Sequence, residues 1–286
     1  MIIDFHTHTF PPHIAERAMK SLAEKADMRA YTDGTNEGLR RHMAASGVDA
    51  CVLMPVVTNP AKQATINRLA AETNETAPET GLFSFGGIHP DNENYKEIIR
   101  FLASHGVKGI KFHPVFTGVD LDDIRYMRII DYANEQGLFI LTHGGLDISF
   151  PGQLQASPLH IRRMLDQVKP DKLILAHMGG WGLWDQAEEL LLDYPLWLDL
   201  STCLPAIEHL SPTSHRLHNW KPREEQLSQE QFVRMVRRLG ADRVLFASDS
   251  PWCDQKATID AVEASGLNDA EKALIFSGNA KKILKI

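Results

Sequence analysis

The amino-acid sequence predicts an α/β fold in which one domain, residues 1–286, closes into a (β/α)8 or TIM barrel. Short apolar runs rich in β-forming residues alternate with longer segments of helical period, which is typical of a parallel sheet wound with helices. We count eight such runs, and eight strands are the number that closes a barrel. No internal repeat, low-complexity tract or linker divides the chain.

The eight predicted strands are apolar enough to be buried on both faces. They comprise residues 2–5, 50–54, 82–87, 109–112, 139–142, 173–176, 196–200 and 244–247. A helix tends to stop at a glycine in the left-handed conformation just past its last turn. The predicted helices 37–46, 95–105, 124–136 and 229–239 are each followed by such a glycine, namely Gly47, Gly106, Gly137 and Gly240.

Prolines and a capping motif mark further helix ends. Pro170 and Pro195 are expected to end the helices that precede strands six and seven. Ser228, with Gln231 three residues later, matches a capping box and predicts the start of the helix before strand eight.

Three strand-to-helix connections are unusually long, at residues 9–36, 144–157 and 202–227. In a barrel these connections lie at the C-terminal rim, where active sites are built. The third is either an exposed irregular loop with a short helix or a lid over the substrate. It carries Pro205, His209, His215, His218, Trp220 and Arg223.

Composition and charge bound the expected partners. The chain is 43% hydrophobic and 23% charged, as in ordinary globular proteins, with a net charge of -7. No global basic field is present for a phosphate backbone, so nucleic acid is not an expected partner. The three cysteines are far apart and odd in number, which predicts a reducing compartment, the cytoplasm. No leader segment or membrane-length apolar run is recognised, so no membrane association is expected, and a homo-oligomer is compatible with the sequence.

His6 and His8 end the first predicted strand. Residues i and i+2 on a strand point to the same face, so both imidazoles can turn into the mouth of the barrel and hold one divalent metal ion. Neutral imidazole suits Zn²⁺ and related ions. The spacing alone is common by chance, so its significance depends on what the other strands supply.

Four further strands also end on titratable or ligating side chains. These are Lys111 and His113 after strand four, His143 after strand five, His177 after strand six and Asp249 after strand eight. Because the carboxyl ends of barrel strands meet at one rim, these side chains are predicted to share a site with His6 and His8. A buried aspartate also requires a partner, and a metal ion is a natural one for Asp249.

In combination these motifs resemble the amidohydrolase superfamily, and within it the small single-domain proteins similar to aminocarboxymuconate-semialdehyde and resorcylate decarboxylases. The motifs are Asp-Phe-His-Thr-His at 4–8, Lys-Phe-His-Pro at 111–114, the histidines of strands five and six, and Ser-Asp-Ser-Pro at 248–251. The resemblance covers nearly the whole chain. It implies that His6, His8, His143 and Asp249 bind a metal, commonly zinc, and that His177 acts near the bound water or substrate.

Two positions depart from the patterns of related proteins. Binuclear members bridge two metals with a carboxylated lysine or a glutamate after strand four, where this chain offers Lys111. One ion is expected, with a second if Lys111 is carboxylated; otherwise Lys111 is a cation that holds a substrate carboxylate or Asp4. The motif Gly-Gly-Ile-His-Pro at 86–90 is similar to one in TatD-like nucleases, which makes His89 a further candidate for a metal or substrate contact. Those enzymes, however, carry glutamate in place of Lys111.

Several neighbours of the motifs have open roles. Asp4 is expected to accept a hydrogen bond behind a metal ligand or to form an ion pair inside the barrel. His113 either contacts substrate or caps the loop after strand four. Trp181 and Trp252 are candidate walls of the substrate site or packing residues.

This set of residues predicts hydrolysis of a small-molecule amide, ester or lactone. A bound metal brings the pKa of its water from near 16 toward about 7, Asp249 accepts the proton as general base, and His177 polarises the carbonyl. The alternative is nonoxidative decarboxylation of an unsaturated or aromatic acid, for which Arg216, Arg223 and Lys111 are candidate partners of the carboxylate. A barrel that binds a metal without turnover would not need so complete a set of groups.

Overall fold

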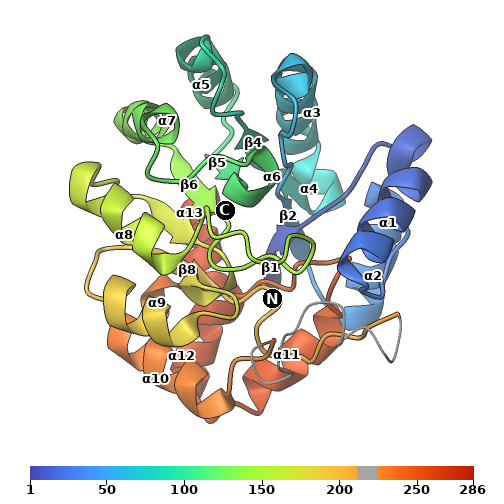
Figure 1. The fold of residues 1–286 in the computed structure, drawn as a ribbon. Helices are drawn as coiled ribbons and strands as arrows, with labels where there is room; N and C mark the ends of the chain where they lie inside the picture. Colours follow the sequence, from blue (N-terminus) through green and yellow to red (C-terminus); the bar gives the residue numbers. More distant parts are fainter. Residues whose placement is uncertain (211–224) are drawn as a thin grey trace.

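The computed structural model describes residues 1–210 and 225–286, and its parallel strands lie inside a ring of helices (Figure 1). The first three strands, β1 (Ile3–Thr7), β2 (Ala50–Leu53) and β3 (Leu82–Ser84), form one parallel sheet in that order. Six more form a second parallel sheet in chain order. These are β4 (Gly86–Gly87), β5 (Gly109–Phe112), β6 (Phe139–Thr142), β7 (Leu173–Leu175), β8 (Trp197–Asp199) and β9 (Val244–Leu245).

Backbone hydrogen bonds connect the two sheets at both edges. On one side, the amide of Phe85, between β3 and β4, donates to the carbonyl of Leu53 at 3.0 Å. On the other side, the amide of Phe5 in β1 donates to the carbonyl of Phe246, directly after β9, at 2.9 Å. The predicted (β/α)8 barrel is thereby confirmed.

The eight predicted strands are all present, and the third is divided in two. Asn67 explains the division, because its side-chain amide donates to the carbonyl of Gly87 at 2.9 Å and accepts from the amide of Gly87 at 2.8 Å. A Cβ at Gly86 would lie 2.7 Å from Asn67 Oδ1, so glycine is required for this close approach.

The helices follow the strands around the barrel. They are α1 (Pro12–Ala26), α2 (Asn36–Ser46), α3 (Gln63–Glu75), α4 (Ala77–Thr80), α5 (Tyr95–Ser104), α6 (Pro114–Thr117), α7 (Ile124–Glu135), α8 (Pro158–Gln167), α9 (Trp184–Leu191), α10 (Gln229–Leu239), α11 (Gln255–Glu263), α12 (Asp269–Ala273) and α13 (Asn279–Leu284). Helix α1 fills most of the first long connection. Within the described residues, no helix combines the length and apolar character needed to cross a bilayer.

The predicted helix ends are largely confirmed. Gly47, Gly106 and Gly137 have φ of 76°, 74° and 73°, the left-handed conformation that stops a helix. The side chain of Ser228 caps α10 by accepting from the amide of Gln231. The prediction of a full capping box is wrong, because the Gln231 side chain does not return to the Ser228 amide. The Gln231 side chain instead donates to Asp185 at 2.8 Å, because that carboxylate on α9 offers a charged acceptor.

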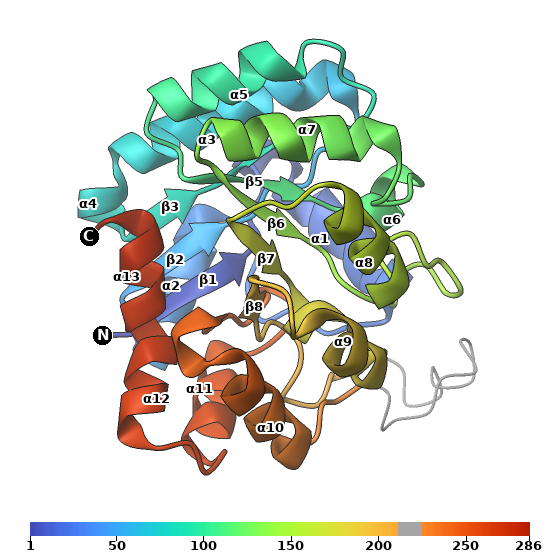
Figure 2. The same cartoon turned by 90° about the vertical axis from the view of Figure 1, so that its left-hand side faces the viewer.

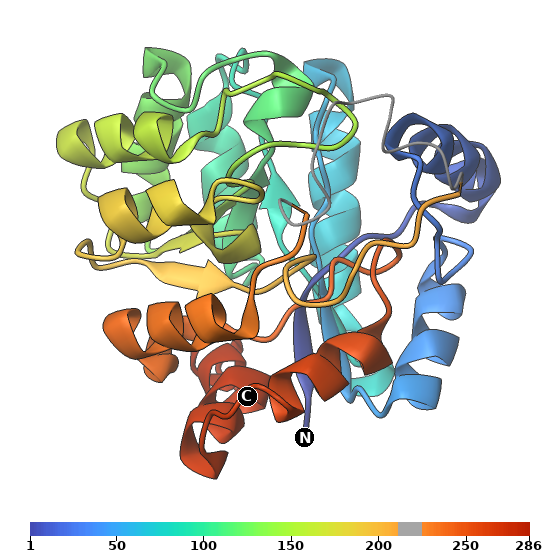
Figure 3. The same cartoon turned by 60° about the horizontal axis from the view of Figure 1, so that its bottom comes forward.

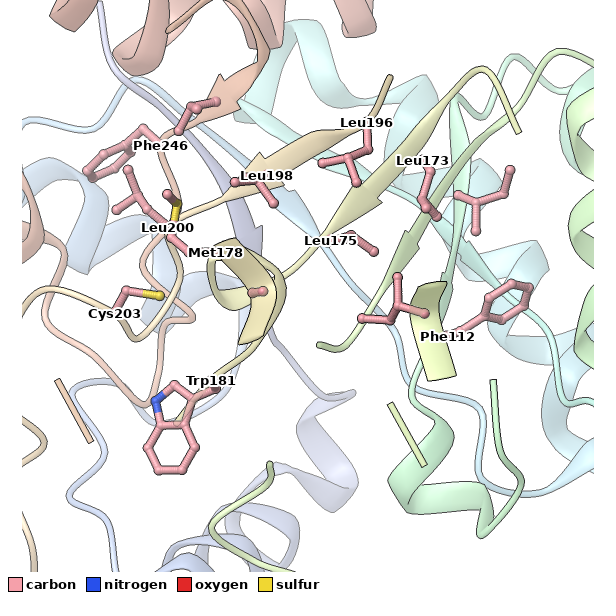
Figure 4. Close-up of a cluster of buried hydrophobic side chains, with 14 of the residues drawn as sticks. Phe112, Leu173, Leu175, Met178, Trp181, Leu196, Leu198, Leu200, Cys203 and Phe246 are labelled. Atoms are coloured by element: carbon pink, nitrogen blue, oxygen red, sulfur yellow. The ribbon is translucent and has the colours of Figure 1, made fainter. Parts of the chain in front are cut away.

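Buried apolar side chains fill two layers. The outer layer lies between the strands and the helices. Figure 4 shows part of it, with Leu173 and Leu175 of β7 beside Leu198 of β8 and Leu196, which directly precedes β8. The inner layer fills the barrel, where Phe5 and other strand residues pack with Ile283 of α13. Figure 2 shows that α13 and both termini lie at the end of the barrel where the strands begin, so the strand-to-helix loops occupy the opposite end.

The third long connection begins beside the first. The amide of Arg29 donates to the carbonyl of Glu208 at 2.8 Å, and the amide of Leu210 donates to the carbonyl of Asp27 at 3.2 Å. Figure 3 shows this segment running next to the end of α1. Of the residues that the sequence singled out in this connection, His215, Arg216, His218, Trp220 and Arg223 lie outside the described residues.

Candidate metal centre

A cavity of about 340 Å³ opens at the carboxyl ends of the strands, as the barrel fold predicts. Its walls are largely apolar, with Phe10, Met54, Phe116, Ile148, Trp181 and Trp252 among the lining residues. Its polar lining contains the predicted site residues His6, His8, Lys111, His113, His143, His177 and Asp249, together with Asp147 and Thr202. The predicted convergence of strand ends is therefore seen in the structure.

His6, His8 and Asp249 form one group that could hold a metal ion, since one ligand atom of each lies within 4.8 Å of the others. The Oδ1 atom of Asp249 is 3.1 Å from Nε2 of His8 and 3.6 Å from Nε2 of His6. The two imidazole planes meet at 65°, so their in-plane lone pairs can converge on one point. The donor set, two imidazoles and a carboxylate, fits a divalent ion such as Zn²⁺.

Asp199, at the end of β8, fixes the orientation of His6. Its Oδ2 lies 2.8 Å from Nδ1 of His6, and both side chains are fully buried. A carboxylate can only accept here, so Nδ1 of His6 carries the hydrogen and Nε2 presents its lone pair to the cavity. Burial alone would raise the pKa of Asp199, but the neighbouring His6 holds it below its ordinary value.

Sequence reasoning missed Asp199. It stands within the predicted strand 196–200, which otherwise reads as apolar, and a carboxylate in such a strand signals a buried partner. The carboxylate also accepts from the amides of His177 and Ser201 at 3.1 Å each. Asp199 therefore joins the ends of three strands, β1, β7 and β8, under the site.

His143 and His177 face one another across the second part of the site. Nε2 of His177 lies 3.1 Å from Nδ1 of His143. The outer nitrogens contact backbone carbonyls, His177 Nδ1 that of Ser201 and His143 Nε2 that of Leu146, each at 2.9 Å. A carbonyl only accepts, so both outer nitrogens carry hydrogen and both inner nitrogens present lone pairs.

Two facing lone pairs require a cation between them. A shared proton meets this need, and so does a metal ion, because two nitrogen ligands at about 2.1 Å from one ion lie roughly 3 Å apart. Burial lowers the pKa of both His143 and His177, which disfavours the extra proton. The unsatisfied lone pairs of His143 Nδ1 and His177 Nε2 indicate that these residues fit a metal-binding site.

Backbone strain accompanies these positions. His177, Thr202 and Asp249 have φ of 57°, 51° and 68°, a left-handed conformation that costs a non-glycine residue roughly 1–2 kcal/mol. They follow β7, β8 and β9 and turn the chain sharply at the rim. The Thr202 hydroxyl donates to Oδ2 of Asp249 at 2.8 Å, so the two turns support one another.

Lys111 is fully buried, and its Nζ lies 3.0 Å from Nε2 of His6. Burial lowers its pKa to about 8. Of the two partners considered for Lys111, a substrate carboxylate and Asp4, the second is not seen: no contact joins Lys111 to Asp4 among the described residues, and β1 has a register shift between Asp4 and Thr7. Asp4 instead accepts from the Ser248 hydroxyl at 2.5 Å and from the Gln255 amide of α11 at 2.8 Å.

Of the remaining candidates, the two tryptophans lie in the site and His89 does not. Trp181 and Trp252 line the cavity, and Nε1 of Trp181 donates to the carbonyl of Thr202 at 3.1 Å. His89 is not brought to the site: it is absent from the described lining, and its Nδ1 accepts from the amide of Asp91 at 3.2 Å in a turn after β4. Arg216 lies outside the described residues.

The barrel and the candidate metal-binding groups at its rim are those of a metal-dependent class of enzyme. The family model described as Amidohydrolase matches residues 3–286, and the chain belongs to the amidohydrolase family. The resemblance drawn from the sequence is thereby confirmed. No curated protein matches the chain.

Solved structures share the fold over nearly the whole chain. An uncharacterised TIM-barrel protein from Bordetella bronchiseptica is 17% identical, with a TM-score of 0.70, covering 99% of this chain and 98% of that one. A dihydroxybenzoic acid decarboxylase from Polaromonas sp. JS666, with bound manganese and the inhibitor 2-nitroresorcinol, is 15% identical, with a TM-score of 0.67 and coverage of 99% and 96%. A probable 2-pyrone-4,6-dicarboxylic acid hydrolase from Acinetobacter baumannii, with bound citric acid, is 15% identical, with a TM-score of 0.62 and coverage of 100% and 99%.

Proposed function

We propose that the protein is a metal-dependent hydrolase that cleaves an amide, ester or lactone of a small molecule with water. The position of Asp249 carries the proposal. One carboxylate oxygen lies 3.1 Å from Nε2 of His8 and 3.6 Å from Nε2 of His6, and the other is held by the hydroxyl of Thr202. A carboxylate fixed in this way is oriented both to bind an ion and to accept a proton beside it.

His6, His8 and Asp249 hold one divalent ion in this proposal, with His143 as the further ligand that the family resemblance implies. Zn²⁺ is the favoured ion for its imidazole and carboxylate donors, and Mn²⁺, which the Polaromonas decarboxylase binds, is the other ion to test. When bound, such an ion acidifies a coordinated water and polarises a carbonyl group. A second ion would require Lys111 as a carboxylated ligand.

The chain's own groups then move the proton. Asp249 accepts it from the attacking water and delivers it to the departing nitrogen or oxygen of the substrate. Asp199 keeps the Nε2 lone pair of His6 directed at the site, and Thr202 prevents rotation of the Asp249 carboxylate. The apolar walls, including Trp181 and Trp252, exclude bulk water and hold the apolar part of the substrate.

The hydrogen bonds change the role proposed for His177. Its Nδ1 hydrogen is donated to Ser201, so in the neutral ring Nε2 accepts and cannot donate to a carbonyl oxygen. We therefore assign His177 as a proton acceptor or ligand beside His143 rather than as the group that polarises the substrate.

Nonoxidative decarboxylation of an unsaturated or aromatic acid is the second candidate. Lys111 favours it, because a buried cation at the floor of an apolar cavity can hold a carboxylate. Among the residues that the structure describes, Lys111 is the one lysine in the cavity lining, and no arginine joins it.

Isotope tracing separates the two reactions. The metal-loaded protein is incubated in ¹⁸O-labelled water with a panel of lactones, esters, amides and aromatic acids. Hydrolysis places one ¹⁸O atom in the organic product, whereas decarboxylation releases CO₂ and leaves the organic product unlabelled. Hydrolytic turnover that survives both metal removal and Asp249→Asn would contradict the proposed function.

A further inference from the structure

His113 and Asp147 form a second polar group in the cavity, apart from His6, His8 and Asp249. His113 follows β5, and Asp147 lies in the connection after β6. Both line the cavity, and their side chains are only 10% and 11% exposed. Nε2 of His113 lies 3.3 Å from Oδ2 of Asp147, so the two side chains act as a pair.

The ring geometry argues against a metal ion at this pair, although His113, His143 and Asp147 come close enough to be considered as ligands. The imidazoles of His113 and His143 are stacked, with centroids 4.3 Å apart and planes only 18° from parallel. An imidazole lone pair lies in the plane of its ring, so two stacked rings cannot direct lone pairs at one ion. The pair must serve another purpose.

Both members of the pair present acceptors. The Asp147 carboxylate offers only acceptor atoms 3.3 Å from Nε2 of His113, which favours the tautomer with hydrogen on Nε2 and a lone pair on Nδ1. Within the described residues, that Nδ1 atom is buried and has no hydrogen-bond partner. An unpartnered buried polar atom is destabilising unless a ligand or water satisfies it.

The pair is held rigidly in place. The amide of Ser149 donates to Oδ1 of Asp147 at 2.7 Å, and the next residue, Phe150, packs against Phe116 with ring centroids 4.8 Å apart. Nζ of Lys25 on α1 lies 3.2 Å from the centroid of the Phe150 ring. The position of the carboxylate therefore does not depend on a bound ligand, as expected of a preorganised recognition group.

The charges that line the cavity also favour a hydrogen-bond donor at the His113 and Asp147 end. Lys111, the single lysine in the described lining, contacts Nε2 of His6 at 3.0 Å, and among the described residues no hydrogen bond or ion pair joins it to His113 or Asp147. A substrate carboxylate at the His113 and Asp147 end would meet a buried carboxylate and an imidazole lone pair. A hydrogen-bond donor would satisfy both.

We propose that His113 and Asp147 recognise a hydrogen-bond donor on the substrate, a hydroxyl or an amino group, at the end away from the reacting carbonyl. The inference rests on the proposed function and narrows its substrate class. The enzyme takes a small carbonyl compound whose second polar group donates hydrogen bonds, and it discriminates against a second carboxylate.

Benzohydroxamate probes test this inference without a known substrate, because the hydroxamate binds the metal ion and the ring enters the cavity. Dissociation constants are measured calorimetrically on the Zn²⁺-loaded protein for the parent compound and for its meta and para hydroxyl, aminomethyl and carboxyl derivatives. The better hydroxyl and aminomethyl derivatives should each bind at least tenfold more tightly than the carboxyl derivatives. In Asp147→Asn, which keeps an acceptor for Ser149, the preference for aminomethyl over carboxyl should fall below threefold while the parent compound binds as before.

The arms separate the possible failures. Carboxyl derivatives that bind the wild-type protein as tightly as the donors would overturn the inference, and this comparison needs no variant to fold. A preference that persists in Asp147→Asn would overturn it equally. Failure of the parent compound to bind a protein shown to contain metal would instead contradict the proposed metal-dependent function.

Discussion

Replacing Asp199 with asparagine should weaken metal binding although Asp199 touches no proposed substrate. The carboxylate accepts the Nδ1 hydrogen of His6 at 2.8 Å and the amide hydrogens of His177 and Ser201 at 3.1 Å. Asparagine has one acceptor oxygen where aspartate has two. If that oxygen keeps the amide hydrogens, the NH₂ group faces His6 and favours the tautomer whose Nε2 carries hydrogen and cannot bind a metal.

The magnitude follows from the chemistry of carboxylate–histidine–metal arrangements. Loss of the group behind a metal-binding histidine typically costs 10–100-fold in metal affinity, or about 1.4–2.7 kcal/mol. We therefore expect the Zn²⁺ dissociation constant of Asp199→Asn to rise by roughly this factor. The fold should persist, because the substitution preserves the volume of the side chain and part of its hydrogen bonding.

Calorimetric titration of Zn²⁺ into chelator-treated protein provides the measurement. A matched control is Asp254→Asn, which alters a histidine–aspartate pair outside the cavity, where Oδ1 of Asp254 lies 3.2 Å from Nε2 of His42. This control should bind Zn²⁺ as the wild type does. Equal affinities for the wild type and a folded Asp199→Asn would refute the role assigned to Asp199.

Other substitutions test the remaining groups of the site. Because burial lowers the pKa of Lys111 from 10.5 to about 8, its charge destabilises the fold below pH 8, and this penalty disappears between pH 8 and 10.5. Between pH 8 and 10.5, the free energy of unfolding of chelator-treated wild type, measured in urea, should thus rise on the order of 3 kcal/mol more than that of Lys111→Met. Parallel pH profiles of unfolding free energy for the two proteins would argue against a buried titrating amine. Thr202→Val, which frees Oδ2 of Asp249, should lower kcat about tenfold with little change in metal content; an unchanged kcat would show that the hydroxyl does not orient the base. His89→Ala should leave metal content and turnover unchanged, and loss of either would place His89 in the site after all.

Much of the fold follows from local sequence. Strands buried on both faces are continuous apolar runs, so all eight could be located from periodicity and from glycines such as Gly47 that end the preceding helices. The break before Gly86 depends on Asn67, which reaches the strand from α3. The orientation of the Gln231 side chain depends on its acceptor Asp185 on α9. Neither contact has a local signal in the sequence.

The site was predictable to the same extent. Residues directly after strands, such as His143 and Asp249, gather at the rim because the barrel brings strand ends together. His89 does not join them, since the chain turns after β4 and its ring is used in that turn. Asp199 and Asp147 were missed because one was hidden in an apolar strand and the other in a loop, where only the folded chain reveals their partners.

Metal content per chain tests the central claim most directly. Elemental analysis of protein purified without chelators should give one equivalent of a divalent metal per chain for the wild type. His6→Ala should lose the ion, while His105→Ala, which removes an exposed histidine outside the cavity, should retain it. A wild-type protein without bound metal that turns over substrate, or a His6→Ala variant with its full metal content, would contradict the account.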